Sequence, residues 1–221
     1  MKFSYMAQDL IIGATHTSAN TMEWALSELL KNPKILAKAI QELNHVIGLD
    51  RLVTEEDLPH LPYIEVVLKE TMRIHPPALM LAPHQAREDT CMDGYDILAG
   101  TTVFINVWGI GHDPVLWDAP EEFRTERFLE SKIDMRGHDF ELMPFRSGQR
   151  MCPRYSLAVK VMMFGLANLV HGFVWRLPEG VTVEELSMEE TFLLAVPRKF
   201  PLEATVEPRL PARLYMSASC P

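Results

Sequence analysis

The sequence predicts a mainly α-helical protein with small β-sheets. Apolar residues recur with helical spacing in four segments, whereas the alternation typical of strands is confined to residues 87–107 and to short stretches near the C-terminus. With 221 residues, of which 48% are hydrophobic, the chain can bury a core as one large domain or two small ones.

The composition excludes several classes of protein. A net charge of −9 argues against nonspecific nucleic-acid binding, because such binding depends on a basic surface. Cys91, Cys152 and Cys220 are widely spaced and odd in number, which indicates neither a disulfide framework nor a zinc site and fits a reducing compartment. No apolar run approaches about 18 residues and the N-terminus resembles no signal peptide, so we expect no membrane anchor in this chain.

The first segment predicts one long helix that begins near Phe3 and ends at Asn32-Pro33. Its middle, residues 13–18, reads G-A-T-H-T-S and consists of poor helix formers. Such a patch indicates either a kink or close approach of another group, or Ser and Thr hydroxyls bonded within a packed helix. The sequence leaves both alternatives open.

Two further helices follow. Residues 33–47 predict an amphipathic helix with Gly48 as its C-terminal cap. After a linker at residues 54–59, residues 63–74 predict a third helix, which Pro76-Pro77 ends.

Glu70 and Arg73 lie three residues apart on this third helix, so their side chains share a face and can pair. Considered alone, such a pair is expected to be a solvated surface ion pair that contributes little to stability.

The period then changes to that of strands over residues 87–107, with Asp93-Gly94 as a hairpin turn. Residues 108–143 form a long irregular stretch, and a coil of this length inside a compact domain usually has a function. Residues 155–171 predict a last helix, and short strands are expected around Val174, Leu193 and Ala204.

The most informative stretch is the loop of residues 144–154, P-F-R-S-G-Q-R-M-C-P-R, which contains Cys152. Residues 142–160 include no Asp or Glu, and their cations are Arg146, Arg150, Arg154 and Lys160. Neighbouring cations and a helix that starts after Pro153 both favour a thiolate. The alternative is that Cys152 is a small buried hydrophobic residue.

Four motifs occur in a specific order: the Thr-containing patch at 13–18, E-x-x-R at 70–73, F-x-x-E-R-F at 123–128 and F-x-x-G-x-R-x-C at 145–152. This series resembles the C-terminal half of the cytochrome P-450 haem-thiolate monooxygenases. The resemblance covers essentially the whole chain. It implies that residues 1–221 form a partial domain, from the oxygen-activating helix to the C-terminal strands, that lacks the N-terminal half of the fold.

Residues 22–30, 73–77 and 106–108 look like the plant A-type microsomal branch of this family. Members of that branch include flavonoid 3'-hydroxylases and terpenoid-oxidising relatives, and they oxidise phenylpropanoids, flavonoids, terpenoids and related apolar compounds.

The resemblance implies haem b (iron protoporphyrin IX) as the cofactor, with Cys152 as its proximal thiolate ligand. It implies that Phe145 packs beside the haem and that Gly148 allows the tight turn. Arg150 and His84 would each meet a propionate. Without the resemblance, His84 would be interpreted as an ordinary loop residue.

By the same resemblance, Glu70, Arg73 and Arg127 form a structural triad that locks the long coil behind the haem. A partly buried network of this kind costs far more to break than a surface pair. Its expected role is folding and haem retention.

The patch in the first helix resembles the oxygen-activating element of the family, in which a widened turn admits dioxygen and a threonine helps to relay protons. Thr17 holds the threonine position. His16 stands where the family usually has an acid, and an imidazole can also carry a proton near neutral pH. Ala14 replaces the usual Gly. Thr17 and His16 are therefore the expected catalytic residues.

The expected substrate lining comes from Ala14 and from two apolar runs that could equally be plain core. These runs are Ala78, Leu79, Met80 and Leu81 after the third helix, and Phe192, Leu193 and Leu194 near the C-terminus.

Three other positions depart from the family pattern. Arg154 replaces a Gly that lets the backbone approach the porphyrin, Arg146 replaces a small residue, and Thr125 replaces a Pro.

The function that the resemblance implies is insertion of one atom of dioxygen into an apolar plant metabolite of the flavonoid, terpenoid or phenylpropanoid class. Electrons would come from an NADPH-cytochrome reductase docked on the basic face of residues 142–160. A full-length relative would lie at the cytosolic face of the endoplasmic reticulum membrane through an N-terminal segment. The alternative is a truncated, catalytically inactive relative that acts as an interaction module.

Overall fold

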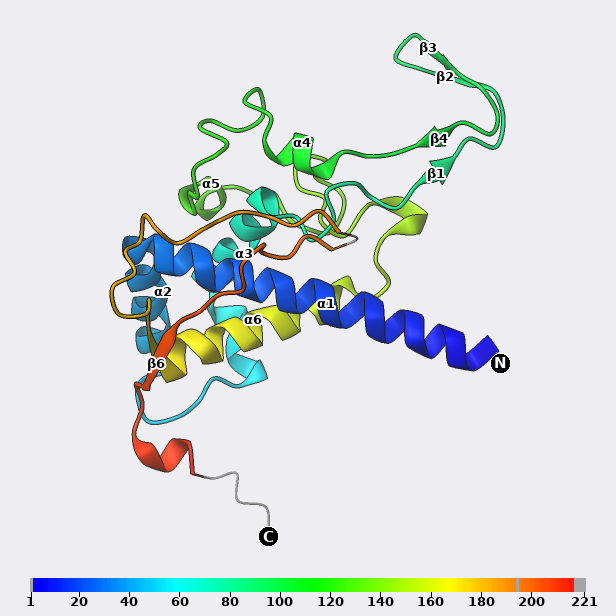
Figure 1. Cartoon of the computed structure of the whole chain (residues 1–221). Coiled ribbons are helices and arrows are strands. Elements are labelled where there is room, and N and C mark those ends of the chain that lie inside the picture. The colour runs from blue at the N-terminus through cyan, green and yellow to red at the C-terminus, as the bar shows by residue number, and fades with distance from the viewer. Residues whose placement is uncertain (1, 194, 217–221) are drawn as a thin grey trace.

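A computed structural model of the chain describes residues 2–193 and 195–216. Its long helices are α1 (Lys2–Lys31), α2 (Pro33–Val46), α3 (Pro62–Ile74) and α6 (Tyr155–Gly172). Helix α1 lies alongside α6, and α3 packs against both (Figure 1). The predicted mainly α-helical fold with small β-sheets is confirmed.

Proline and glycine set the helix boundaries as the sequence predicts. Helix α2 begins with Pro33 in its first turn, and Gly48 follows it at a φ of 79°. Helix α3 begins with Pro62 and is capped at His75, just before Pro76.

The predicted linker at 54–59 is wrong in part, because most of it forms the 3-10 helix η1 (Glu55–His60). A capping box starts this turn: the backbone N–H of Thr54 donates to Asp57 Oδ2 at 2.8 Å. Arg51 then pairs with Asp57 at 2.6 Å.

The strand region projects from the helices as a narrow arm (Figure 1). In it β1 (His84–Gln85) pairs antiparallel with β4 (Thr102–Val103), and β2 (Thr90–Met92) with β3 (Tyr95–Ile97). Asp93 and Gly94 join β2 to β3 with φ values of 51° and 82°, as expected for a tight hairpin turn. The strands are shorter than the predicted alternation over residues 87–107.

The predicted irregular stretch holds two short helices, α4 (Val107–Gly111) and α5 (Glu126–Leu129). The 3-10 turn η2 (Gly148–Arg150) lies in the cysteine loop.

After α6, β5 (Phe173–Arg176) pairs antiparallel with β6 (Thr205–Pro208), and η3 (Ala212–Leu214) follows. The strand expected around Leu193 does not form, and an isolated bridge joins Glu190 to Arg198 instead.

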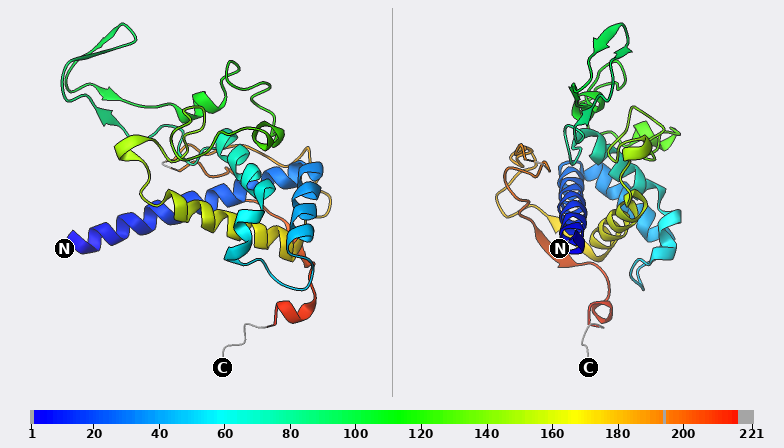
Figure 2. Two further views of the ribbon diagram at one scale, coloured as in Figure 1. Left: turned by 180° about the vertical axis from the view of Figure 1, so that it is seen from behind. Right: turned by 90° about the vertical axis from the view of Figure 1, so that its right-hand side faces the viewer.

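The core lies between the second half of α1 and helices α2, α3 and α6. The first half of α1 extends beyond the other helices (Figure 2), and residues 13–16 are exposed. Among the described residues, no helix combines the length and the apolar character needed to cross a bilayer.

Candidate functional site

The cysteine loop closes on itself immediately before α6. The backbone N–H of Cys152 donates to the carbonyl of Phe145 at 2.9 Å, and the N–H of Tyr155 donates to the carbonyl of Cys152 at 3.3 Å. Cys152 is a half-buried free thiol two residues before Arg154, the N-cap residue of α6. Cys152 therefore lies just before the N-terminal end of α6, where the helix dipole is positive.

Two positions in the loop have left-handed backbones. Gly148 has a φ of 62° at the start of η2, and Arg146 has a φ of 69°. This conformation costs a residue with a Cβ roughly 1–2 kcal/mol, so Arg146 must be held by its surroundings. Arg154, by contrast, has a φ of −117° and an exposed side chain, so its backbone does not require a glycine.

Arg146 connects the cysteine loop to the strand arm. Its Nη2 donates to Nε2 of His84 at 2.9 Å and to the carbonyl of Ala82. A cavity of about 160 Å³ adjoins this contact and is lined by Leu81, His84, Ile105, Phe140, Met143, Arg146 and Ser147. The structure therefore brings the predicted residues His84 and Leu81 to the cysteine loop, whereas Arg150 is exposed.

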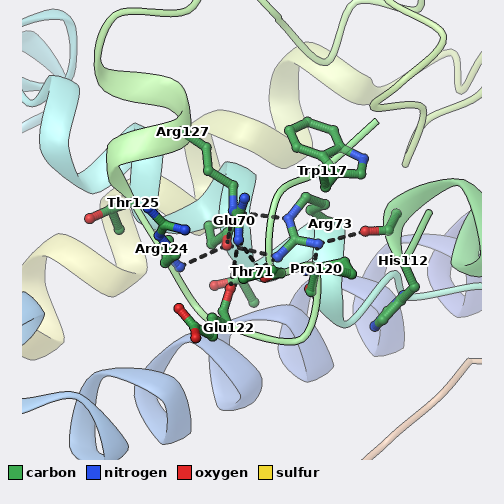
Figure 3. A network of polar contacts seen from close by, with 12 residues as sticks. Glu70, Thr71, Arg73, His112, Trp117, Pro120, Glu122, Arg124, Thr125 and Arg127 are labelled. Carbon is green, nitrogen blue, oxygen red and sulfur yellow. Dashed lines mark hydrogen bonds and ion pairs between the residues drawn. The ribbon is translucent and has the colours of Figure 1, made fainter. Parts of the chain in front are cut away.

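Glu70 of α3 lies at the centre of a buried network of polar contacts (Figure 3). Arg73 donates from Nε and Nη2 to its two carboxylate oxygens, each at 2.8 Å, and Arg127 Nε lies 3.2 Å from Oε1. The side chains of Glu70 and Arg73 are fully buried. The expectation of an exposed surface pair is wrong, because the coil of residues 108–127 covers this face.

Both guanidinium groups also bind backbone carbonyls of that coil. Arg73 Nη1 donates to the carbonyls of Gly111 at 2.5 Å and Pro120 at 2.8 Å. Arg127 Nη2 donates to the carbonyl of Ala119 at 2.6 Å. The indole of Trp117 lies 5.3 Å from the guanidinium of Arg73, a contact that the sequence did not reveal (Figure 3). The network thus fixes an irregular segment that has little regular structure of its own.

The patch in α1 is regular helix. Thr17 Oγ1 donates to the carbonyl of Gly13 at 2.9 Å, and the α-helix is continuous from Lys2 to Lys31. Of the two alternatives for this patch, the hydroxyl bond within the helix is the one observed, and the expected kink or widened turn is absent. Ala14 and His16 on this stretch are exposed.

The segments that carry the two apolar runs are joined next to those runs, and the exposures of the runs differ. The N–H of Val196 donates to the carbonyl of Pro77 at 3.1 Å, which brings the C-terminal run to the one after α3. In the first run Leu81 is buried, Ala78 and Leu79 are half-buried and Met80 is exposed. Phe192 and Leu193 are largely exposed. Leu194 lies outside the described residues.

Sequence reasoning missed a buried histidine bridge. The imidazole of His75 lies 2.8 Å from Glu28 and 3.0 Å from Glu190, and it stacks on Trp24 with ring centroids 3.9 Å apart. Burial works to lower the pKa of His75, but its hydrogen bonds with Glu190 and Glu28 outweigh burial and raise that pKa. The bridge joins α1, the end of α3 and the C-terminal segment.

Comparison with known proteins agrees with this arrangement. The sequence model described as cytochrome P450 matches residues 4–202. Trimethyltridecatetraene synthase of Zea mays is 55% identical over 219 residues, covering 97% of this chain and 40% of that protein. Flavonoid 3'-monooxygenase of Petunia hybrida is 44% identical over 212 residues, covering 94% of this chain and 41% of that protein.

A zebra fish cytochrome P450 solved with progesterone superposes with a TM-score of 0.79 at 33% identity, over 91% of this chain and 44% of that one. The chain therefore spans less than half the length of these relatives. The resemblance predicted from the order of the motifs is confirmed, and the chain belongs to the cytochrome P450 family.

Proposed function

We propose that this chain forms the thiolate-bearing part of a plant monooxygenase that inserts one atom of dioxygen into an apolar metabolite. The observation that carries the proposal is the closed loop in which Cys152, bonded through its N–H to Phe145, precedes α6 within a segment that has cations and no acids. A cysteine thiolate is one of the protein ligands that hold haem iron.

The residues around the loop fit haem, the cofactor of this family. The backbone of Arg154 has an ordinary negative φ, so this position accommodates a residue other than glycine. The side chain of Arg146 reaches His84. The side chain of Arg146 also retains a buried Nε–H without an acceptor, as expected beside a site for a carboxylate. Cys152 would hold the iron and Arg150 one propionate, while His84 lies beside the place of the other.

When bound, haem supplies the redox centre for dioxygen chemistry, and the chain supplies its surroundings. The loop closed by the Cys152 N–H and the Phe145 carbonyl holds Cys152 in place before α6. The hydroxyl of Thr17, which donates to the Gly13 carbonyl, would help to move protons at the site, as would His16, its neighbour in the sequence. Glu70, Arg73 and Arg127 hold the coil that covers α3.

The proposed substrates are apolar plant metabolites of the terpenoid, flavonoid or phenylpropanoid class. Two relatives are named for a branched polyene and for a flavonoid. The apolar runs at residues 78–81 and 192–193 are partly exposed, and a hydrogen bond between the flanking residues Val196 and Pro77 joins their segments. We infer that they contribute to a substrate lining of matching apolar character.

The proposed electron donor is an NADPH-dependent reductase. Arg150 and Arg154 of the cysteine loop and Lys160 of α6 are exposed, and these cations would attract an acidic docking surface. For a longer protein that includes this chain, we infer attachment to the endoplasmic reticulum membrane with this face towards the cytosol.

The test is the absorption spectrum of the haem-reconstituted chain, reduced and exposed to carbon monoxide, compared with Cys152→Ala. A thiolate-type Soret band that Cys152→Ala lacks is the expected result. A chain that folds, by circular dichroism, and takes up haem without this band would overturn the proposal.

A second candidate is a catalytically inactive interaction module. The observation in its favour is an exposed apolar stripe on α6 with helical spacing, formed by Leu157, Val161 and Phe164, which are 55%, 47% and 38% exposed. A folded chain that takes up no haem would support this candidate over the first.

A further inference from the structure

Arg146 has an unusual backbone conformation for its residue type. Its backbone is left-handed at a φ of 69°, a conformation uncommon for a residue other than Gly, Asn or Asp. Its side chain reaches His84 on β1.

The guanidinium of Arg146 is only partly satisfied. An arginine has donors and no acceptor, so Nε2 of His84 accepts the hydrogen bond from Nη2 at 2.9 Å, as does the carbonyl of Ala82. Nε is buried without a partner. Over residues 13–193 and 195–216, no carboxylate is found within ion-pair distance of Arg146. A partly buried cation therefore lacks a counter-charge.

The adjoining cavity has the character of a site for an amphipathic anion. Its volume is about 160 Å³, and apolar side chains of Leu81, Ile105, Phe140 and Met143 form much of its wall, with Arg146 and His84 at one side. A carboxylate on a short apolar stem matches both features, because the stem contacts the apolar wall while the carboxylate meets the guanidinium. A strongly hydrated inorganic anion would gain nothing from this wall.

We propose that Arg146, positioned by His84, makes this cavity a carboxylate subsite that receives a propionate arm of the porphyrin. This inference rests on the proposed binding of haem by the chain. It assigns Arg146 a binding role at a position where the cysteine motif of the family usually has a small residue. The cavity lies at the same loop as Cys152, since the carbonyl of Phe145, the residue before Arg146, accepts the Cys152 N–H.

The experiment uses metal-free protoporphyrin IX and its dimethyl ester, in which two methyl groups cap the propionates and remove their charge. Binding to the intact chain is followed by quenching of tryptophan fluorescence, so it requires neither iron ligation nor activity. The variant is Arg146→Asn, because Asn tolerates a left-handed backbone. The matched control is Lys160→Asn, which removes an exposed cation from α6.

We expect Arg146→Asn to weaken binding of the free acid by about tenfold or more, the loss expected for one charge-assisted hydrogen bond, and to leave ester binding unchanged. Lys160→Asn should change neither. Equal losses on acid and ester, tighter acid binding by Arg146→Asn, or no binding of the acid by the unmodified chain would each overturn the subsite.

A second variant separates positioning from direct contact. His84→Ala frees the guanidinium, so it should also weaken binding of the acid selectively, and the double variant should lose little more than Arg146→Asn alone. Additive losses would contradict a positioning role for His84.

Acid-selective binding that depends on Arg146, in a chain without a thiolate-type spectrum, would retain the subsite and overturn the monooxygenase proposal alone.

Discussion

Arg73 donates two hydrogen bonds of 2.8 Å to the two carboxylate oxygens of Glu70, and solvent reaches neither side chain. We expect Glu70→Ala to lower the free energy of unfolding by about 3–5 kcal/mol, because it leaves buried guanidinium groups without a counter-charge. Equilibrium urea denaturation followed by circular dichroism measures the change.

The matched control for Glu70→Ala is a surface pair. Lys199 lies 2.6 Å from Glu189, but the two side chains are 51% and 59% exposed. Lys199→Ala should therefore cost no more than about 1 kcal/mol. Similar losses in both variants would contradict the stabilising role of the buried network.

Arg127→Lys should loosen the coil of residues 108–127 while α2 stays intact. A lysine keeps the charge near Glu70 but lacks the planar fork that also reaches the carbonyl of Ala119 at 2.6 Å. The expected result is faster hydrogen exchange at the Glu122 amide, which donates to the carbonyl of Ala119 at 3.0 Å. The Leu43 amide in α2 is the internal control, and an equal increase there would indicate global destabilisation instead.

The helices could be predicted from the sequence because their signals are local. Pro33, Gly48 and Pro62 act through their own backbone preferences, and apolar spacing identifies the buried faces. Helix η1 was missed because a single turn has no periodicity, although Thr54 and Asp57 carry the capping signal that could have found it.

The exposure of Glu70 and Arg73 could not be predicted from spacing, because spacing shows that they share a face and not what covers it. The covering coil begins more than thirty residues later, with Gly111 separated from Arg73 by 38 positions. The family resemblance supplied that long-range information for Arg127. It gave no sign of the left-handed Arg146, whose conformation depends on contacts with Ala82 and His84.

The bridge at His75 should make stability depend on pH. Hydrogen bonds with Glu190 and Glu28 raise the pKa of His75 above its ordinary value of 6.5, so protonated His75 stabilises the fold. This contribution is fully present below pH 6.5 and is lost as the pH rises through the higher folded-state pKa. The difference in unfolding free energy between the unmodified chain and His75→Gln should therefore shrink as the pH rises above neutral. A difference that grows with pH would show that the neutral imidazole is the stabilising form.

Gly111, which packs against the Glu70 network, and Gly165, which packs against Met22, offer a matched test of close packing. A Cβ at Gly111 would lie 2.3 Å from the backbone oxygen of Arg73, in the buried helix α3, whereas a Cβ at Gly165 would lie 2.7 Å from Met22 Sδ. A helix backbone cannot move aside, but a methionine side chain can change rotamer. We expect Gly111→Ala to cost about 1–3 kcal/mol or more through overpacking.

In Gly165→Ala, by contrast, the new side chain displaces Met22 but raises the helix propensity of α6 by up to about 1 kcal/mol. The two effects offset each other, so the Gly165→Ala variant should be about as stable as the unmodified chain. Urea denaturation of both variants measures the two effects under the same conditions. Gly111 also accepts a hydrogen bond from Arg73 through its carbonyl, so its displacement weakens the network that holds the coil. Equal stability of the two variants would mean that the coil of residues 108–127 can shift without a loss of unfolding free energy. The Glu70 network would then not determine the position of this coil.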